Sequence, residues 1–206
     1  MDTPLPGLHA SEPQSLPFAP QLLVRSFVLE RPAGDLLLYG TEAEPAIAGA
    51  KARYLNHWHE AMFAADLDGT PTHVHELDRE QSENRTAIAG TFADRTTLDG
   101  DFEVIPTPGH TPGATAFLWD SGEHRMLFTG DSLFLDEGEW VIALDVRGAD
   151  RDAYVASLEL IRGLDFDVLV PWAATAGQPP HAMTDAADVG RRIDAILDRV
   201  RRGDDR

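Results

Sequence analysis

Short apolar runs separated by turn residues dominate the first two thirds of the chain, which is the pattern of β-strands. Residues 21–30 and 35–40 are two such runs, and the Pro-Ala-Gly segment between them predicts a hairpin. An Asp-Gly pair divides residues 96–109 into two extended runs, and Asp-Gly is a strong hairpin signal. Further strands are expected at residues 72–77, 115–120, 125–131 and 165–172, and at the start of residues 52–59.

Apolar residues at helical spacing appear in the last third of the chain. Tyr154, Val155, Leu158 and Ile161 predict a helix over residues 149–163, with a terminal glycine as its C-cap. A second amphipathic helix is expected over residues 183–202. Its apolar stripe consists of Val189, Ile193, Ile196, Leu197 and Val200. Weaker helical patterns cover residues 41–52 and 61–67.

The order of these elements bounds the domain organisation. Residues 1–20 contain five prolines and are expected to form an irregular arm. Residues 21–206 are expected to form one domain, because no internal segment is rich enough in Gly, Ser or Pro to act as a linker. Strands mixed with helices in both halves indicate an α/β fold in which helices cover sheets.

Composition excludes several classes of partner and ligand. The formal net charge of -18 argues against nucleic acid and anionic membranes. The chain has no cysteine, so disulfides and thiolate metal ligands are excluded, and any metal ion would depend on His and carboxylate side chains. No segment approaches a membrane span, and the N-terminus lacks the features of a secretory signal. A cytoplasmic location is therefore expected.

Among the charged residues, arginine is far more frequent than lysine and aspartate more frequent than glutamate. Of the 17 basic residues only Lys51 is a lysine, and Asp outnumbers Glu. An acidic, Asp-rich surface suits a protein that is dissolved in high salt, where self-repulsion is screened. A GC-rich genome explains the preference for arginine equally well, so the composition leaves both explanations open.

Histidines in two short motifs are the first candidates for chemistry. His57 and His59 are two positions apart in Asn-His-Trp-His-Glu, and in an extended segment such side chains project to the same side. His73 and His75 repeat the same spacing. The spacing is common by chance, so alone it is weak evidence for a metal site.

Three further segments place polar or turn residues beside predicted strands. Two Pro-Gly pairs bracket His110 in a stiff loop, and Asp131 follows the apolar run that ends in Phe-Thr-Gly. A carboxylate directly after a buried strand is either a loop cap or a ligand for a cation. The segment 168–177 is a strand that ends at Pro171 and continues into a loop.

In order and spacing these segments resemble the metallo-β-lactamase fold superfamily, which includes hydroxyacylglutathione hydrolases, lactonases, β-lactamases and RNA-processing nucleases. The resemblance covers roughly residues 20–175. It implies an α/β four-layer αββα sandwich, in which two mixed β-sheets are flanked by helices. It also implies that His57, His59 and His110 bind a first zinc ion, and that Asp131 is the aspartate that bridges two metals in relatives.

The second metal site departs from the family pattern. Ala61 and Met62 stand where relatives have an aspartate and a histidine, and Ala173 stands where a final histidine is expected. Methyl and thioether groups cannot replace these ligands at zinc. Possible substitutes are Glu60, His75, Glu76 and His181.

Three hypotheses follow for the function. The first is a hydrolase of an ester, thioester or lactone with one zinc ion, in which Asp131 is the catalytic carboxylate. The second is an inactive family member that binds no metal and serves as a binding or structural module. The third is a redox site with iron or manganese, which the same donors can bind. The substrate would be a small molecule of unknown identity, and Phe134, Trp140 and Val141 would suit a homodimer contact.

Overall fold

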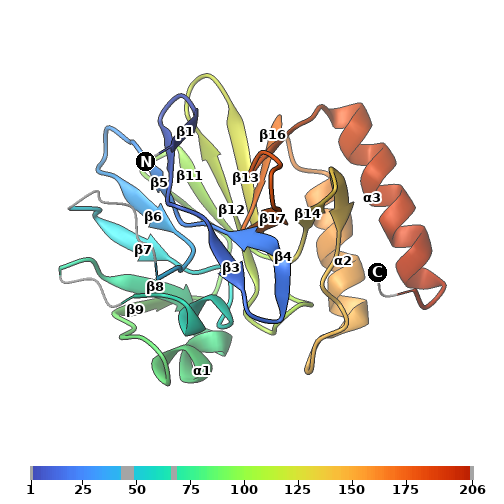
Figure 1. The fold of residues 1–206 in the computed structure, drawn as a ribbon, viewed down its shortest axis with the longest axis horizontal. Helices are drawn as coiled ribbons and strands as arrows, with labels where there is room; N and C mark the ends of the chain where they lie inside the picture. Colours follow the sequence, from blue (N-terminus) through green and yellow to red (C-terminus); the bar gives the residue numbers. More distant parts are fainter. Residues whose placement is uncertain (1, 43–48, 66–68, 205–206) are drawn as a thin grey trace.

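The computed structural model of the chain describes residues 2–42, 49–65 and 69–204, and their strands form three sheets (Figure 1). The first sheet has seven strands, which are antiparallel from β1 to β6 and parallel from β6 to β9. In spatial order these strands are β1 (Asp2–Leu5), β2 (Leu8–Ala10), β5 (Phe27–Leu29), β6 (Leu36–Leu38), β7 (Ala52–Tyr54), β8 (Thr72–His75) and β9 (Gly90–Phe92).

The second sheet has six strands. Its pairs are antiparallel except for β13 with β16, which run in parallel. In spatial order the strands are β10 (Thr96–Leu98), β11 (Phe102–Pro106), β12 (Thr115–Asp120), β13 (Arg125–Gly130), β16 (Val168–Pro171) and β18 (Ala182–Met183).

The third sheet is a smaller one that joins the N-terminal hairpin to later parts of the chain. β14 and β17 pair in parallel, and the other pairs are antiparallel. Its strands in spatial order are β15 (Glu139–Val141), β14 (Phe134–Asp136), β17 (Ala173–Thr175), β4 (Ala19–Val24) and β3 (Gln14–Leu16).

The six-stranded sheet is buried on both faces, which explains its continuous apolar runs. In β12, Phe117 and Trp119 face a core shared with the seven-stranded sheet, whereas Leu118 faces the helices. β13 alternates in the same way, with Phe128 on the first side and Leu127 on the second. Each strand therefore contributes side chains to two separate cores.

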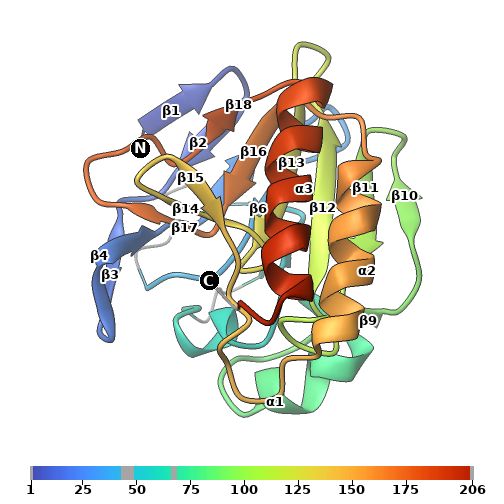
Figure 2. The same cartoon turned by 90° about the vertical axis from the view of Figure 1, so that its right-hand side faces the viewer.

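Two long helices cover the outer face of the six-stranded sheet (Figure 2). α2 (Arg151–Arg162) begins at the N-cap Asp150, and α3 (Ala186–Arg201) begins at the N-cap Asp185. The other helices in the described part of the chain are short: η1 (Glu60–Met62), η2 (Glu76–Asp78) and α1 (Arg79–Glu83). All five residues of the predicted α3 stripe are buried. No helix among the described residues is long and apolar enough to cross a bilayer.

The α/β fold class of mixed sheets and flanking helices is confirmed, but several local predictions are wrong or untested. Residues 1–20 are not an irregular arm, because β1, β2 and β3 lie within them and pair with later strands. Of the weak helical pattern at residues 61–67, only Ala61 and Met62 belong to a helix, the short η1; residues 63–65 are not helical, and residues 66 and 67 lie outside the described residues. The predicted helix at 41–52 falls largely on residues 43–48, which also lie outside them. The boundary of a single domain at residue 21 stays a prediction.

Candidate metal centre

The first pair of candidate histidines lies on the turn that follows β7. The chain bends into η1 directly after His59, so residues 57–59 form a turn and not an extended segment. The His57 side chain is fully buried, and its Nδ1 lies 3.2 Å from Glu60 Oε1 and 3.1 Å from Asn56 Oδ1. With the Nδ1 proton donated to Asn56 Oδ1, Nε2 carries the lone pair of the ring and points to the opposite side.

The loop that carries His110 is fixed by α2. His110 Nδ1 donates to the carbonyl oxygen of Ala143 at 2.7 Å, which leaves Nε2 as the free acceptor. Gly109 has φ +142°, and a Cβ there would lie 2.5 Å from the Tyr154 Cα atom, so only glycine permits this approach to the helix. Ser157 of α2 also donates to the carbonyl of Pro108. The imidazole therefore has one orientation.

Asp131 follows the end of β13 and faces both histidines. Its Oδ2 lies 3.4 Å from His57 Nε2 and 3.6 Å from His110 Nε2. Gly130 adopts φ +56°, and a side chain at this position would overlap the side chain of Asn56. The Tyr154 hydroxyl donates to the carbonyl of Ser132 at 2.6 Å and anchors the loop after Asp131.

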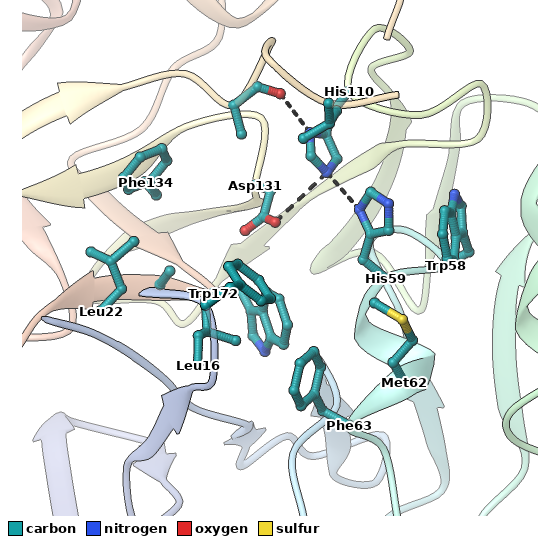
Figure 3. A pocket seen from close by; sticks show the side chains of 14 residues that line it. Leu16, Leu22, Trp58, His59, Met62, Phe63, His110, Asp131, Phe134 and Trp172 are labelled. Carbon is teal, nitrogen blue, oxygen red and sulfur yellow. Dashed lines mark hydrogen bonds and ion pairs between the residues drawn. The ribbon is translucent and has the colours of Figure 1, made fainter. Parts of the chain in front are cut away.

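Together these four side chains form one cluster with converging ligand atoms. One ligand atom each from His57, His59, His110 and Asp131 lies within 4.8 Å of all the others. His59 Nδ1 is 2.9 Å from His110 Nε2 (Figure 3). Zinc bonds of about 2.0–2.1 Å in a tetrahedron place ligand atoms roughly 3.3 Å apart. The distances between inward-facing atoms given above, 2.9 Å, 3.4 Å and 3.6 Å, lie around that value.

Two features of the donors fit a metal ion. The buried Nε2 of His57 makes no hydrogen bond of good geometry, since the acceptor that faces it, Asp131 Oδ2, lies 3.4 Å away, although buried polar atoms are normally satisfied. Metal-bound histidines usually donate their other ring proton to a carboxylate or a carbonyl, as His110 does to Ala143, while the outer nitrogen of His57 bonds Asn56 Oδ1 with the Glu60 carboxylate 3.2 Å away. The residues present therefore fit one divalent ion held by three nitrogens and one oxygen.

Without an ion, the charges in the cluster are strongly coupled. Burial lowers the pKa of His57, but the hydrogen bonds to Asp131 and Glu60 outweigh it and raise this pKa to about 10. Burial and the neighbouring His57 and His110 lower the pKa of His59 to about 3. Burial would raise the pKa of Asp131, but the hydrogen bond to His57 brings it below its usual value. Burial raises the pKa of Glu60 to about 7 despite the hydrogen bond from His57.

A buried carboxylate that the sequence analysis missed connects the two histidine loops. Asp78 accepts from the Trp58 amide at 3.1 Å, the Thr111 hydroxyl at 2.6 Å and the Gly113 amide at 2.9 Å. Gly113 permits this contact, since a Cβ there would lie 2.7 Å from Asp78 Cγ. The sequence signal for Asp78 was an acidic residue shortly after the predicted strand at 72–77. A carboxylate placed after a strand is also the signal that identified Asp131.

None of the four proposed substitute ligands belongs to the cluster. Glu60 faces Nδ1 of His57, on the side away from the converging atoms. His75 is used at both nitrogens, since Nδ1 accepts from the Leu77 amide and Nε2 donates to the Ala93 carbonyl. Glu76 and His181 are also outside it. In the described part of the chain, nothing restores the second metal site.

The cluster lies at one end of an apolar pocket of about 430 Å³ (Figure 3). Met62 and Ala173, at two positions where relatives would have metal ligands, line this pocket. The N-terminal hairpin β3–β4 contributes another part of the wall. The other apolar lining residues are Leu16, Phe18, Leu22, Trp58, Phe63, Phe134, Ala143, Val146 and Trp172.

Comparison with known proteins agrees with this geometry. The chain matches no curated protein sequence. The structure is similar to a metallo-beta-lactamase from Hirschia baltica (13% identity, TM-score 0.69, covering 93% of this chain and 94% of that one). It is also similar to one from Pontibacter korlensis (16% identity, TM-score 0.65, 95% of both chains). A third is FIM-1 from Pseudomonas aeruginosa in its mono-zinc form (12% identity, TM-score 0.66, 94% and 93%). The sequence model of the metallo-beta-lactamase superfamily matches residues 34–173, and the chain belongs to that superfamily.

Proposed function

We propose that the protein is a hydrolase that uses one divalent metal ion, zinc in the first place, to cleave an ester, thioester or lactone. The observation that carries this proposal is the convergence of three imidazoles and one carboxylate at the end of a pocket. Membership of a superfamily that includes hydrolases supports it. The missing ligands at positions 61, 62 and 173 restrict the proposal to a single ion.

In this proposal His57, His59 and His110 hold the ion with Nε2, Nδ1 and Nε2 respectively, the atoms that the structure turns inward. A zinc ion in such a site lowers the pKa of a bound water and polarises a carbonyl oxygen. Glu60 and the carbonyl of Ala143 fix two of the rings through their outer nitrogens. The donors are thus oriented before the ion binds.

Asp131 is the proposed catalytic residue. Its carboxylate is half-buried at the pocket end, and its pKa, which the neighbouring His57 lowers, keeps it ionised at neutral pH. It therefore accepts a hydrogen bond from the attacking water and orients it towards the carbonyl carbon. Water adds to that carbon, the bond to the leaving oxygen or sulfur breaks, and the products are a carboxylic acid and an alcohol or thiol.

A second candidate, a binding module without metal, is favoured by one specific observation. His59 Nδ1 and His110 Nε2 are close enough for a direct hydrogen bond at 2.9 Å. The proton that makes this bond, together with the ion pair between His57 and Asp131, would satisfy most of the cluster without an ion. In that case the apolar pocket alone would carry the function.

Metal analysis of protein purified without chelators separates the two candidates. The hydrolase requires about one zinc per chain, and replacement of His110 by Ala should reduce the zinc content to near zero. His124→Ala is the matched control, because this histidine pairs with Asp167 outside the cluster and should keep the zinc. Absence of zinc from both the purified protein and zinc-loaded samples would support the binding module. Stoichiometric iron or manganese in the purified protein would mean that this metal takes the place of zinc in the proposed hydrolase.

Other expectations accompany the proposal. Nucleic acid and anionic membranes are not expected as partners, because the formal net charge of the chain is -18. The cytoplasmic location and the homodimer stay predictions. Trp140, one of the residues expected to form a dimer contact, is buried within the chain beneath Arg192.

A further inference from the structure

We infer that the substrate is uncharged and carries an apolar acyl or alkyl chain, which lies along the wall formed by Met62, Phe63 and Trp172. This inference rests on the proposed function, since it names the substrate class of the same pocket. Three independent features of the pocket carry it: the charges of its lining, the chemistry of its wall, and its polarity from one end to the other.

The lining offers no counter-ion for an anionic substrate. The ionisable side chains that line the pocket are His59, His110 and Asp131, and no Arg or Lys is among them. Residues 43–48 and 66–68, which lie outside the described part, contain no basic residue either. Apart from the metal ion that the cluster would hold, nothing in this lining neutralises an anion, so a carboxylate or phosphate along the apolar wall would be desolvated without a partner, which is costly.

The wall is also apolar at Trp172, although the indole ring of this residue carries a polar N–H group. Trp172 donates its indole N–H to the carbonyl of Gly40 at 3.1 Å, so this donor is already used. The Phe63 ring packs against the Trp172 ring with centroids 5.5 Å apart. Met62 is 39% exposed and extends the same wall towards solvent. The replacement of metal ligands at 62 and 173 has therefore enlarged an apolar surface.

The pocket has a polar end and an apolar end. Figure 3 shows Asp131, His110 and His59 together, with Trp172, Phe63 and Leu16 on the opposite side. A carbonyl placed beside Asp131 would direct an attached chain along Trp172 and Phe63 towards the β3–β4 hairpin. Phe18, which is 76% exposed at the tip of that hairpin, lines the outer end. A volume of about 430 Å³ lies in the usual range for small ligands.

The test uses uncharged probes that are not hydrolysed. Methyl alkyl ketones of increasing chain length and alkanoates of matched length are added to the full chain, and the displacement of N-phenyl-1-naphthylamine is followed by fluorescence. Each added methylene should tighten ketone binding about threefold to fourfold until the pocket is filled. The alkanoates should bind at least about tenfold more weakly than the ketones in protein dialysed against EDTA. Equal binding of the two series, or no dependence on chain length, would overturn the inference.

Two variants locate the binding to this wall. Met62→Glu places a charge on the wall and should weaken 2-octanone binding about tenfold or more. Leu77→Glu is the matched control: Leu77 is 58% exposed, does not line the pocket, and its replacement should leave the binding unchanged. Met62→Leu, which keeps the apolar surface, should bind 2-octanone like the unmodified protein. Equal effects of the two glutamates would also overturn the inference.

Zinc content measured on the same samples separates this inference from the proposed function. Zinc binding combined with weak, length-independent ketone binding contradicts the apolar substrate and leaves the hydrolase standing. Ketone binding with the expected length dependence, in protein that takes up no metal, contradicts the hydrolase and leaves the apolar ligand class.

Discussion

Replacement of Asp78 by Asn should cost stability and zinc affinity together. The carboxylate accepts three hydrogen bonds, one from the loop of His57 and His59 and two from the loop of His110. Hydrogen bonds to a charged group contribute about 1.5–3 kcal/mol each. An amide of the same size keeps one oxygen but turns an NH₂ group towards a donor, so we expect a loss of roughly 2–4 kcal/mol in the free energy of unfolding.

The same change should reach the metal ligands through the backbone. Trp58 lies between His57 and His59, and Thr111 follows His110 directly, so loosening either segment displaces imidazoles. Loss of such supporting contacts typically weakens metal binding by about tenfold to hundredfold. Asp78 acts here as a positioning residue, because the contacts the structure gives it lead to the loops and not to the converging ligand atoms.

Two measurements check this prediction. Guanidinium unfolding of the metal-free protein gives the change in stability, and competition with a chromophoric chelator gives the zinc dissociation constant. Asp167→Asn is the control. This carboxylate also accepts hydrogen bonds that are partly buried, from His124 and the Arg125 amide, but it lies away from the cluster. An Asp78→Asn protein that loses less than about 1 kcal/mol and binds zinc as before would refute the reasoning.

Four further predictions concern the cluster and the helices that support it. Glu60→Gln should weaken zinc binding about tenfold, because the carboxylate 3.2 Å from His57 Nδ1 is lost; unchanged affinity in the chelator assay would contradict this role. Near pH 8.5 zinc binding should release about one proton per ion, because the pKa of His57 is raised to about 10 and the ligand must be neutral. The release should fade as the pH rises above about 10, and calorimetry in buffers of different ionisation enthalpy measures it. Gly109→Ala should destabilise by at least about 2 kcal/mol, since its Cβ would lie 2.5 Å from the Tyr154 Cα atom, and a thermal melt detects the loss. Leu158→Ala should cost about 2–5 kcal/mol in chemical denaturation, because Leu158 is fully buried between α2 and the sheet; a loss below about 1 kcal/mol would mean that this core is loosely packed.

Elements whose local pattern agrees with their burial were predictable from the sequence. β12 and β13 are apolar on both faces, so their runs are visible without knowledge of the partners. The Asp99-Gly100 turn has positive φ at both residues, which an Asp-Gly pair favours, and it joins the hairpin strands β10 and β11, whose last paired residues are Leu98 and Phe102. The stripe of α3 matches a helix that covers one face of a sheet.

Elements that depend on distant partners were not predictable. β3 (Gln-Ser-Leu) and the first residues of β4 (Ala-Pro), which precede the predicted run at 21–30, become strands because β3 pairs with β4 and β4 pairs with β17, about 150 residues away. The same long-range pairing brings Leu16 and Leu22 to the pocket. No local pattern in residues 1–20 indicates either outcome.

In the candidate site, too, some residues were predictable from the sequence and others were not. His57, His59, His110 and Asp131 were identified from motifs, and the structure brings their ligand atoms together. Glu60 was considered as a substitute ligand, but the turn at residues 57–59 places its carboxylate beside Nδ1 of His57, away from the converging atoms. Asp78 and the Ala143 carbonyl act through contacts that only the folded chain provides.

The most direct measurement of the central claim is zinc K-edge X-ray absorption of the zinc-loaded protein. The structure predicts one ion with three imidazole nitrogens at about 2.0–2.1 Å, completed by oxygen. Replacement of His59 by Ala should remove one nitrogen from this shell. A spectrum of zinc surrounded by oxygen alone, or one that does not change in that variant, would contradict the assignment of the three histidines.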